Sequence, residues 1–175
     1  KERIAENQLP HILTLLQTSY PGVAVQSDAN HNIYITKGEA DLYPCMVAHL
    51  DTVHSRYKGF DVAVTTDGSL LYAYCDTKDV TNENMPILNQ PSFKVQAGVG
   101  GDDRAGIYVA LHMLRELPYF KVCLVVEEET GGSRGSGACD MSFFDDVSMV
   151  LQCDRRGASD WVTSISGTSL ATRDF

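Results

Sequence analysis

Three short segments of the chain are mainly apolar: residues 44–50, 121–126 and 148–153. Such runs are typical of strands buried on both faces, as in a parallel sheet that helices cover. Ahead of the second run, residues 103–117 place apolar side chains at helical spacing, and Pro118 ends this segment. The alternation of strand, helix and strand predicts an α/β fold with a mixed, mostly parallel central sheet covered by helices.

Local signals predict several shorter elements. Alternating segments joined by turn residues predict two β-hairpins, with strands at 23–26 and 32–36 and at 61–66 and 69–74. Partly helical spacing over 2–19 predicts a helix. The other expected elements are an irregular segment at 76–99, a short helix near 138–145, a fourth buried strand at 161–166 and the beginning of a helix at 168–175.

Composition narrows the class of protein. The 175 residues, 43% of them hydrophobic, suffice for one globular domain over 1–175, and the net charge of -9 argues against nucleic acid or an anionic membrane as the main partner. No apolar run approaches the roughly 20 residues that span a membrane, and no signal peptide is visible. Five cysteines without repeated spacing, with Cys45, Cys123 and Cys153 in apolar runs, predict buried free thiols and a cytoplasmic location.

Each of the three apolar runs ends in a cluster of acidic or histidine side chains, and a further acidic pair stands just before the predicted helix. In open α/β sheets, ligand sites gather at the carboxyl ends of the strands, so we expect these clusters to converge. Carboxylate oxygens together with imidazole form a ligand set for zinc-like divalent ions. The residues are His49 with Asp51, Asp102 with Asp103, Glu128 with Glu129, and Asp154.

Each cluster taken singly has a plainer explanation. His49 at the end of a strand is more often a structural residue than a metal ligand. Asp102 or Asp103 can simply cap the helix, and residues 127–129 can be a solvated strand exit. Because all of these explanations would have to hold at once, the four clusters together favour an active site.

Two neighbouring features carry weaker signals. The glycine-rich segment 131–137 lacks the Gly-x-x-x-x-Gly-Lys-Ser/Thr pattern of a phosphate-binding loop, so we expect a tight turn. Arg155 and Arg156 directly follow Asp154. These arginines either pair with a substrate carboxylate or balance the charge of the acidic site.

The clusters resemble the motifs of the metal-dependent exopeptidases with two co-catalytic zinc ions, which include peptidase T-like tripeptidases, carboxypeptidase G-like and acylase enzymes, and zinc aminopeptidases. The family pattern is His-x-Asp, Gly-x-Asp-Asp-x-x-Gly, Glu-Glu-x-Gly, a lone Asp or Glu, and a distant His. The resemblance spans residues 45–154 and implies the zinc-exopeptidase fold. The matching segments are His49-Leu50-Asp51, residues 100–106, Glu128-Glu129-Thr130-Gly131 and Asp154.

The resemblance implies a role for each metal ligand. His49 and Asp154 would hold one zinc ion, and Glu129 would bind a second. Asp102 would bridge the two ions, and the choice of Asp102 over Asp103 rests on the alignment of the motif. Family members hold the bridging aspartate in a cis peptide, so the resemblance also implies a cis bond between these two aspartates.

The resemblance implies the catalytic roles as well. Glu128 would be the general base that takes a proton from the attacking water. Asp51 would lie behind His49, accept its other ring N–H and fix the tautomer of the imidazole. Glu127, just before the glutamate pair, is expected to face away from the site.

One element of the family pattern has no counterpart. No histidine follows His112, so the C-terminal histidine that completes the second zinc site is missing. We expect residues 1–175 to be the N-terminal part of a catalytic zinc-peptidase domain, without its C-terminal portion and without a lid or dimerisation domain through which a homo-oligomer would form. A divergent chain that holds one metal ion or none is the alternative.

The expected function is that of a metal-dependent hydrolase, which uses zinc to cleave an amide bond of short peptides or acylated amino acids. The alternative is a non-catalytic or single-metal homologue used for binding or assembly. The family branch stays open. The long segment between His49 and Asp102 favours the peptidase T-like branch, whereas the glycine-rich run after Glu129 favours the aminopeptidase branch.

Overall fold

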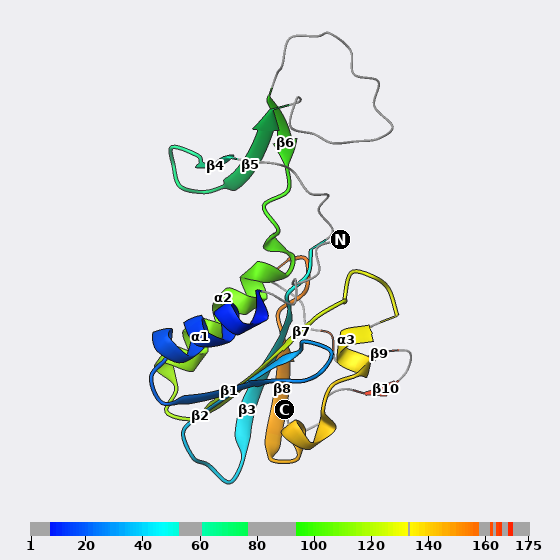
Figure 1. Ribbon diagram of the computed structural model, residues 1–175. Coiled ribbons are helices and arrows are strands. Elements are labelled where there is room, and N and C mark those ends of the chain that lie inside the picture. Colours follow the sequence, from blue (N-terminus) through cyan, green and yellow to red (C-terminus); the bar gives the residue numbers. More distant parts are fainter. Residues whose placement is uncertain are drawn as a thin grey trace.

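A five-stranded sheet forms the centre of the fold (Figure 1). Its strand order is β1-β2-β7-β3-β8, and the long helices α1 and α2 lie against one face. The computed structural model describes residues 8–52, 61–76, 94–132, 134–157, 162, 164–165 and 168–169.

Both directions of pairing occur in this sheet. Strands β1 and β2 form the predicted N-terminal hairpin, and β2 also pairs antiparallel with β7. Strand β3 pairs in parallel with β7 on one side and with β8 on the other. The predicted mixed α/β sheet is therefore confirmed, with the parallel pairings grouped at one end. The strands are β1 (Val23–Ser27), β2 (Ile33–Lys37), β3 (Tyr43–His49), β7 (Phe120–Val125) and β8 (Val147–Gln152).

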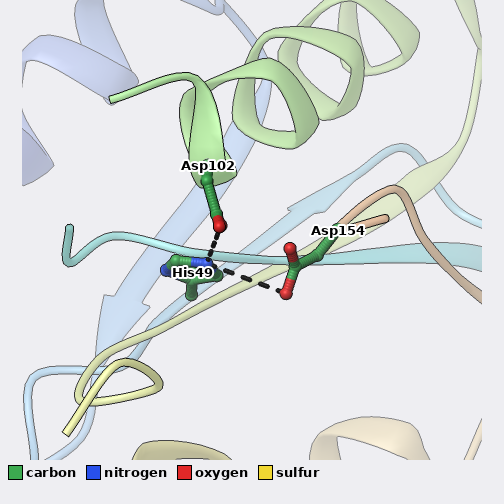
Figure 2. A group of neighbouring side chains, drawn as sticks. All are labelled: His49, Asp102 and Asp154. Atoms are coloured by element: carbon green, nitrogen blue, oxygen red, sulfur yellow. Dashed lines mark hydrogen bonds and ion pairs between the residues drawn. The ribbon is translucent and has the colours of Figure 1, made fainter. Parts of the chain in front are cut away.

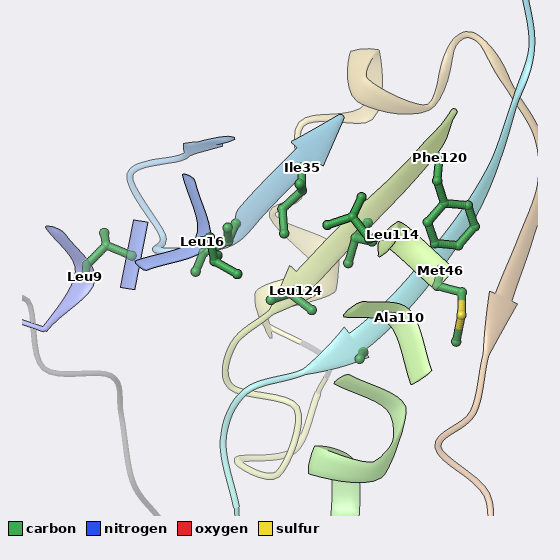
Figure 3. Packing of buried hydrophobic residues seen from close by; sticks show 11 residues of the cluster. Leu9, Leu16, Ile35, Met46, Ala110, Leu114, Phe120 and Leu124 are labelled. Carbon is green, nitrogen blue, oxygen red and sulfur yellow. The ribbon is translucent and has the colours of Figure 1, made fainter. Parts of the chain in front are cut away.

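The central strands bury side chains on both faces. Along β2, Ile33 and Ile35 pack in the core under α1 and α2, whereas Tyr34 between them packs against Phe143 on the opposite face. All six positions of β7 are buried, which explains why, apart from Lys121, its residues are apolar and do not alternate with polar ones. Figure 3 shows the core on the helix side, where Leu9, Leu16, Ala110 and Leu114 meet Ile35, Met46, Phe120 and Leu124.

The two long helices are α1 (Leu9–Ser19) and α2 (Gly101–Glu116). Lys37 at the end of β2 donates from Nζ to the carbonyl oxygens of Leu114 at 2.9 Å and Arg115 at 3.2 Å. These bonds satisfy two of the carbonyl groups that the end of α2 leaves free. Among the described residues, no helix is both long enough and apolar enough to cross a membrane.

A second layer of short helical segments covers the other face of the sheet. These are α3 (Arg134–Gly137) and the 3₁₀ helix η2 (Met141–Phe144), where the sequence predicted one short helix near 138–145. Lys121 of β7 is buried, donates from Nζ to the carbonyl oxygen of Phe143 at 2.8 Å and pairs with Asp146. The buried ammonium group of Lys121 thus finds two bonding partners, and these bonds also fasten η2 to the sheet.

Three more strands form a separate antiparallel sheet, which stands apart from the five-stranded sheet in Figure 1. Strands β4 (Asp61–Val64) and β5 (Leu71–Asp76) confirm the second predicted hairpin. Strand β6 (Lys94–Ala97) pairs with β5, so the prediction that 76–99 is irregular is wrong at β6. Hydrogen bonds to the backbone of β5 hold this strand. Its four residues are too few to show an alternating hydrophobic pattern, so the sequence did not predict it. Residues 77–93 lie outside the described part of the chain.

Two predictions near the end of the chain are wrong. Strands β9 (Ser164–Ile165) and β10 (Thr168–Ser169) pair with each other and do not join the five-stranded sheet. The pair replaces the fourth buried strand expected at 161–166 and the helix expected from 168 onward. Hydrogen bonds between the two backbones satisfy the polar groups of these short segments, and such bonds require no apolar run in the sequence. Apart from Val162, the remaining residues of the two predicted segments lie outside the described ones.

Strand β8 is less buried than its sequence predicted. Positions along β8 alternate between partly buried and exposed, and Val150 is exposed, because β8 is the edge of the sheet. Cys153, just beyond this strand, is also exposed, so the expectation that it is a buried thiol is wrong. Cys45 and Cys123 are free and buried as predicted.

Candidate metal centre

The carboxyl ends of three adjacent strands bring the predicted site residues together. Strands β7, β3 and β8 are parallel neighbours and therefore end at the same edge of the sheet. His49 is the last residue of β3, Glu128 and Glu129 follow β7, and the start of α2 supplies Asp102. With Asp154 after β8 and Asp51 after His49, all six residues to which the resemblance gives a metal-binding or catalytic role meet at this edge.

His49, Asp102 and Asp154 form the first potential ligand group, which Figure 2 shows. The Nε2 atom of His49 lies 2.8 Å from Oδ1 of Asp102 and 3.7 Å from Oδ2 of Asp154. The imidazole is fully buried, whereas 65% of the Asp102 side chain and 24% of the Asp154 side chain are exposed. The group therefore has a fixed, buried nitrogen and two carboxylates that solvent can reach.

Glu128 and Glu129 form a second potential ligand group with the same histidine. In both groups, one candidate ligand atom from each residue lies within 4.8 Å of the others. The Oε1 atom of Glu129 is buried and has no hydrogen-bond partner among the described residues. A buried carboxylate oxygen without a donor is costly, and a cation at this position would satisfy it.

Asp51 joins the two groups through separate atoms. Its backbone carbonyl oxygen lies 2.8 Å from Nδ1 of His49 and accepts the hydrogen of this nitrogen, so Nε2, which faces Asp102, is the nitrogen that a metal ion would take. Its carboxylate accepts two backbone N–H groups, from Glu128 to Oδ1 and from Glu129 to Oδ2, both at 3.0 Å. The sequence placed Asp51 behind His49, but it missed this use of the carboxylate.

Asp103 has a structural role that differs from that of Asp102. Its buried carboxylate accepts the backbone N–H of Gly106 on Oδ1 at 3.0 Å and that of His49 on Oδ2 at 3.2 Å. It thus caps the regular part of α2 and ties that helix to the end of β3. A Cβ at Gly106 would overlap this carboxylate. The peptide bond between Asp102 and Asp103 is cis, as the resemblance implied.

The carboxylates of the site repel one another in a partly buried place. Burial raises the pKa of Asp154 to about 6, and the charge of Asp102 adds to the effect. Burial and the same neighbour also raise the pKa of Glu129. Burial would lower the pKa of His49, but its hydrogen bond to Asp102 and the charge of Asp154 raise it. These shifts show an excess of negative charge that a divalent cation would neutralise.

The loop from Val126 to Gly135 carries the two glutamates. Glu127 has a left-handed backbone with φ of 57°, and its carbonyl oxygen accepts the hydroxyl of Thr130 at 2.9 Å. Gly131 follows with φ of 83°, and its N–H donates to the carbonyl oxygen of Glu128 at 3.3 Å. The tight turn expected of the glycine-rich segment is therefore present where the segment begins.

Sequence reasoning missed one buried residue beside this loop. Asn32 is fully buried just before β2, and its side chain bonds to Val126 and Gly135. A polar residue at the start of an apolar strand was the only available signal. Arg155 and Arg156 are exposed, and the two explanations for them remain predictions.

No protein-family model matches the chain, and no curated protein matches it. Two solved structures are similar in fold. A tripeptidase from Staphylococcus aureus subsp. aureus mu50 is 18% identical with a TM-score of 0.58, and the match covers 86% of this chain and 38% of that chain. An aminoacylhistidine dipeptidase from Vibrio alginolyticus is 19% identical with a TM-score of 0.53, and the match covers 86% of this chain and 29% of that chain.

The chain thus spans less than two fifths of the length of either solved structure. At 18% and 19% identity, the likeness establishes the fold. The chain has the fold of these two peptidases, and the fold predicted from its motifs is confirmed.

Proposed function

We propose that the chain forms the metal-binding edge of a metal-dependent hydrolase, which cleaves an amide bond of short peptides or acylated amino acids. One observation carries the proposal: a buried imidazole nitrogen and four carboxylates from three strand ends and a helix start converge at one edge of the sheet. The motif resemblance and the fold of a tripeptidase and a dipeptidase agree with it.

The donor set fits divalent ions. His49 and Asp154 would hold one ion and Glu129 would hold a second, and Asp102 would contribute a carboxylate to both. Nε2 of His49, which faces the carboxylates of Asp102 and Asp154, favours a cation at this position. The buried Oε1 of Glu129, which has no hydrogen-bond partner among the described residues, favours a second cation beside it. A divalent ion held there, zinc in the enzymes that the sequence resembles, would supply the positive charge that polarises a scissile carbonyl and lowers the pKa of water.

Glu128 is the proposed general base. Its backbone is fixed by the Asp51 carboxylate, and its partly exposed side chain belongs to the ligand group around His49. It removes a proton from the water oxygen that bonds to the scissile carbon. It then gives that proton to the amide nitrogen as the carbon–nitrogen bond breaks.

A single-metal or non-catalytic protein is the second candidate. Both potential ligand groups contain His49, and its Nδ1 atom is already bonded to the carbonyl oxygen of Asp51. One imidazole offers its remaining nitrogen to one ion, so the described residues supply a histidine for one ion only. The stoichiometry of metal binding separates the two candidates.

Zinc titration followed by calorimetry and thermal unfolding tests the proposal. We expect two bound ions per chain, a higher melting temperature, and hydrolysis of at least one member of a panel of dipeptides, tripeptides and N-acyl amino acids. One ion without hydrolysis would favour the second candidate. The absence of any zinc-dependent stabilisation would overturn the metal-dependent hydrolase and leave a non-catalytic protein.

A Glu128→Gln variant tests the assignment of the base. We expect it to bind zinc as the wild type does and to lose at least about 100-fold in turnover, because the amide cannot take the proton. Glu127→Gln is the matched control, since it removes the neighbouring carboxylate from the same loop and should keep most of the activity. Unchanged turnover in Glu128→Gln would show that another group is the base.

A further inference from the structure

A buried polar side chain closes the loop that carries the two glutamates. Asn32 is 0% exposed, and its Oδ1 atom accepts the backbone N–H of Val126 at 3.1 Å. Its Nδ2 atom donates to the carbonyl oxygen of Gly135 at 3.0 Å. Val126 and Gly135 are the two ends of the loop, so one amide side chain bridges its neck.

The two ends of this loop are in direct contact. A Cβ at Gly135 would overlap the carbonyl oxygen of Val126, so only glycine allows the two backbones to approach this closely. The side chain of Asn32 lies between the two ends: it accepts the N–H of Val126 and donates an N–H to the carbonyl oxygen of Gly135. The loop therefore begins and ends at a single fixed point, where the end of β7 meets α3.

Asp28 sets the orientation of the Asn32 amide. Its Oδ2 accepts Nδ2 of Asn32 at 2.9 Å and the hydroxyl of Tyr34 at 2.7 Å, while its Oδ1 accepts the backbone N–H of Asn32 at 3.0 Å. Burial would raise the pKa of Asp28, but the hydrogen bonds from Tyr34 and Asn32 lower it. An ionised carboxylate only accepts, so it holds the NH₂ group toward itself and turns Oδ1 toward Val126.

We propose that Asn32 is a positioning residue for Glu128 and Glu129, and that Asp28 acts through it. The loop then has two anchors, with Asn32 at its neck and the Asp51 carboxylate at the amides of the glutamates. Without the side chain of Asn32, the N–H of Val126 and the carbonyl of Gly135 are unpaired, and the loop opens so that water can bond to them. A catalytic role for this positioning rests on the proposed function, whereas the anchoring of the loop by Asn32 does not.

Hydrogen–deuterium exchange on the full, metal-free chain tests the inference. Asn32→Asp keeps the size of the side chain and the acceptor for Val126, but it removes the donor to Gly135 and sets a second carboxylate against Asp28. We expect the amides of residues 126–132, 134 and 135 to exchange about tenfold faster in this variant. Amides in β3 and in β7 ahead of Val126 should keep their wild-type rates. Asn30→Ala is the matched control, because Asn30 lies in the same turn, is exposed and uses only its backbone N–H to bond Asp28. Unchanged exchange, or a rise spread evenly over the sheet, would overturn the inference.

Asp28→Asn keeps the test decisive if Asn32→Asp fails to fold. Both oxygens of Asp28 face donors, so either orientation of the new amide sets an NH₂ against one of them. We expect faster exchange in the same residues, by a smaller factor. Unchanged exchange there would also contradict the inference.

Metal titration of the same variants adds the functional readout. We expect Asn32→Asp to weaken the zinc ion assigned to Glu129 and to lower kcat with little change in KM, while the ion at His49 and Asp154 stays. Equal weakening of both ions would mark Asn32 as merely structural. If the wild type binds no zinc at all, the proposed function fails, and the exchange result still decides whether Asn32 holds the loop.

Discussion

The two sides of the proposed metal centre are built in different ways. On one side, the imidazole of His49 sits at the end of a central strand and is fully buried, and Asp103 fastens its backbone to the start of α2. On the other side, Glu128 and Glu129 lie on a loop that is held by side chains from distant parts of the chain. We call these the histidine side and the glutamate side.

The difference shows what each kind of support requires. The sheet fixes the position of a ligand at the end of a buried strand, because hydrogen bonds to β7 and β8 hold the backbone of β3 on both sides. A ligand on a loop needs dedicated hydrogen bonds, here from Asp51 and Asn32, to reach comparable precision. We therefore expect substitutions to affect the two sides independently, except where one residue serves both.

His49 serves both sides, so its loss should have the largest effect. In His49→Gln, zinc binding should weaken at least about 100-fold and hydrolysis should fall below detection, because both ligand groups lose their only nitrogen. Calorimetry and a peptide hydrolysis assay measure the two effects. His112→Gln is the control, since His112 is exposed on α2. Retained zinc binding in His49→Gln would contradict the assignment.

Two glycines allow each side to be disturbed alone. Gly135→Ala should spread the neck of the glutamate loop and lower turnover about 100-fold while the ion at His49 remains. Gly106→Ala should displace the carboxylate of Asp103 and weaken zinc binding on the histidine side first.

Zinc titration and kinetics on both glycine variants measure this split. Gly137→Ala is the control, because a Cβ there would meet nothing within 4 Å. If Gly135→Ala and Gly106→Ala gave the same pattern of losses, the two sides would not be separately supported.

Asp51→Asn separates the two functions of one residue. Its backbone carbonyl still orients the ring of His49, but the new NH₂ group opposes the N–H of Glu128 or Glu129. We expect turnover to fall about 10- to 100-fold while the affinity of the ion at His49 changes little. Loss of zinc affinity in proportion to turnover would show that the carboxylate supports the histidine side instead.

The smallest expected effect is on the pH dependence of stability. The folded state raises the pKa of Asp154 from an ordinary value of 3.8 to about 6, so the metal-free folded chain binds more protons than the unfolded chain between these values. Stability from this group is present below pH 3.8 and is lost as the pH rises through about 6. Thermal unfolding should show the wild type losing a few degrees relative to Asp154→Asn over this interval.

Saturating zinc should reverse this trend. An ion favours the ionised carboxylate, so the stabilisation by zinc should grow as the pH rises through the same interval. A difference between wild type and Asp154→Asn that does not vary with pH would contradict the proposed environment of Asp154.

Sequence patterns predicted the histidine side better than the glutamate side. Strand β3 is buried between two neighbours, which imposes an apolar run and marks His49 at its end. The bond from Val126 to Asn32 joins residues 94 positions apart, and the bonds from the glutamates to Asp51 span 77 and 78 positions. Such partners depend on how the chain folds back, and local periodicity does not reveal them.

The same physical reason explains the failures elsewhere in the fold. Strand β6 and the β9–β10 pair are held by backbone bonds in short segments, so their side chains carry little pattern. The exposure of Cys153 follows from the position of β8 at the edge of the sheet. The order of the strands depends on the whole fold, so an apolar run in the sequence does not predict which strand lies at the edge of the sheet.

Anomalous X-ray scattering at the zinc edge, on crystals of the zinc-loaded chain, tests the central claim most directly. We predict a peak bounded by His49, Asp102 and Asp154, at the edge where β3 and β8 end. A second, weaker peak beside Glu129 would support the two-metal assignment. Zinc bound only elsewhere on the chain, with no peak among these three residues, would contradict it.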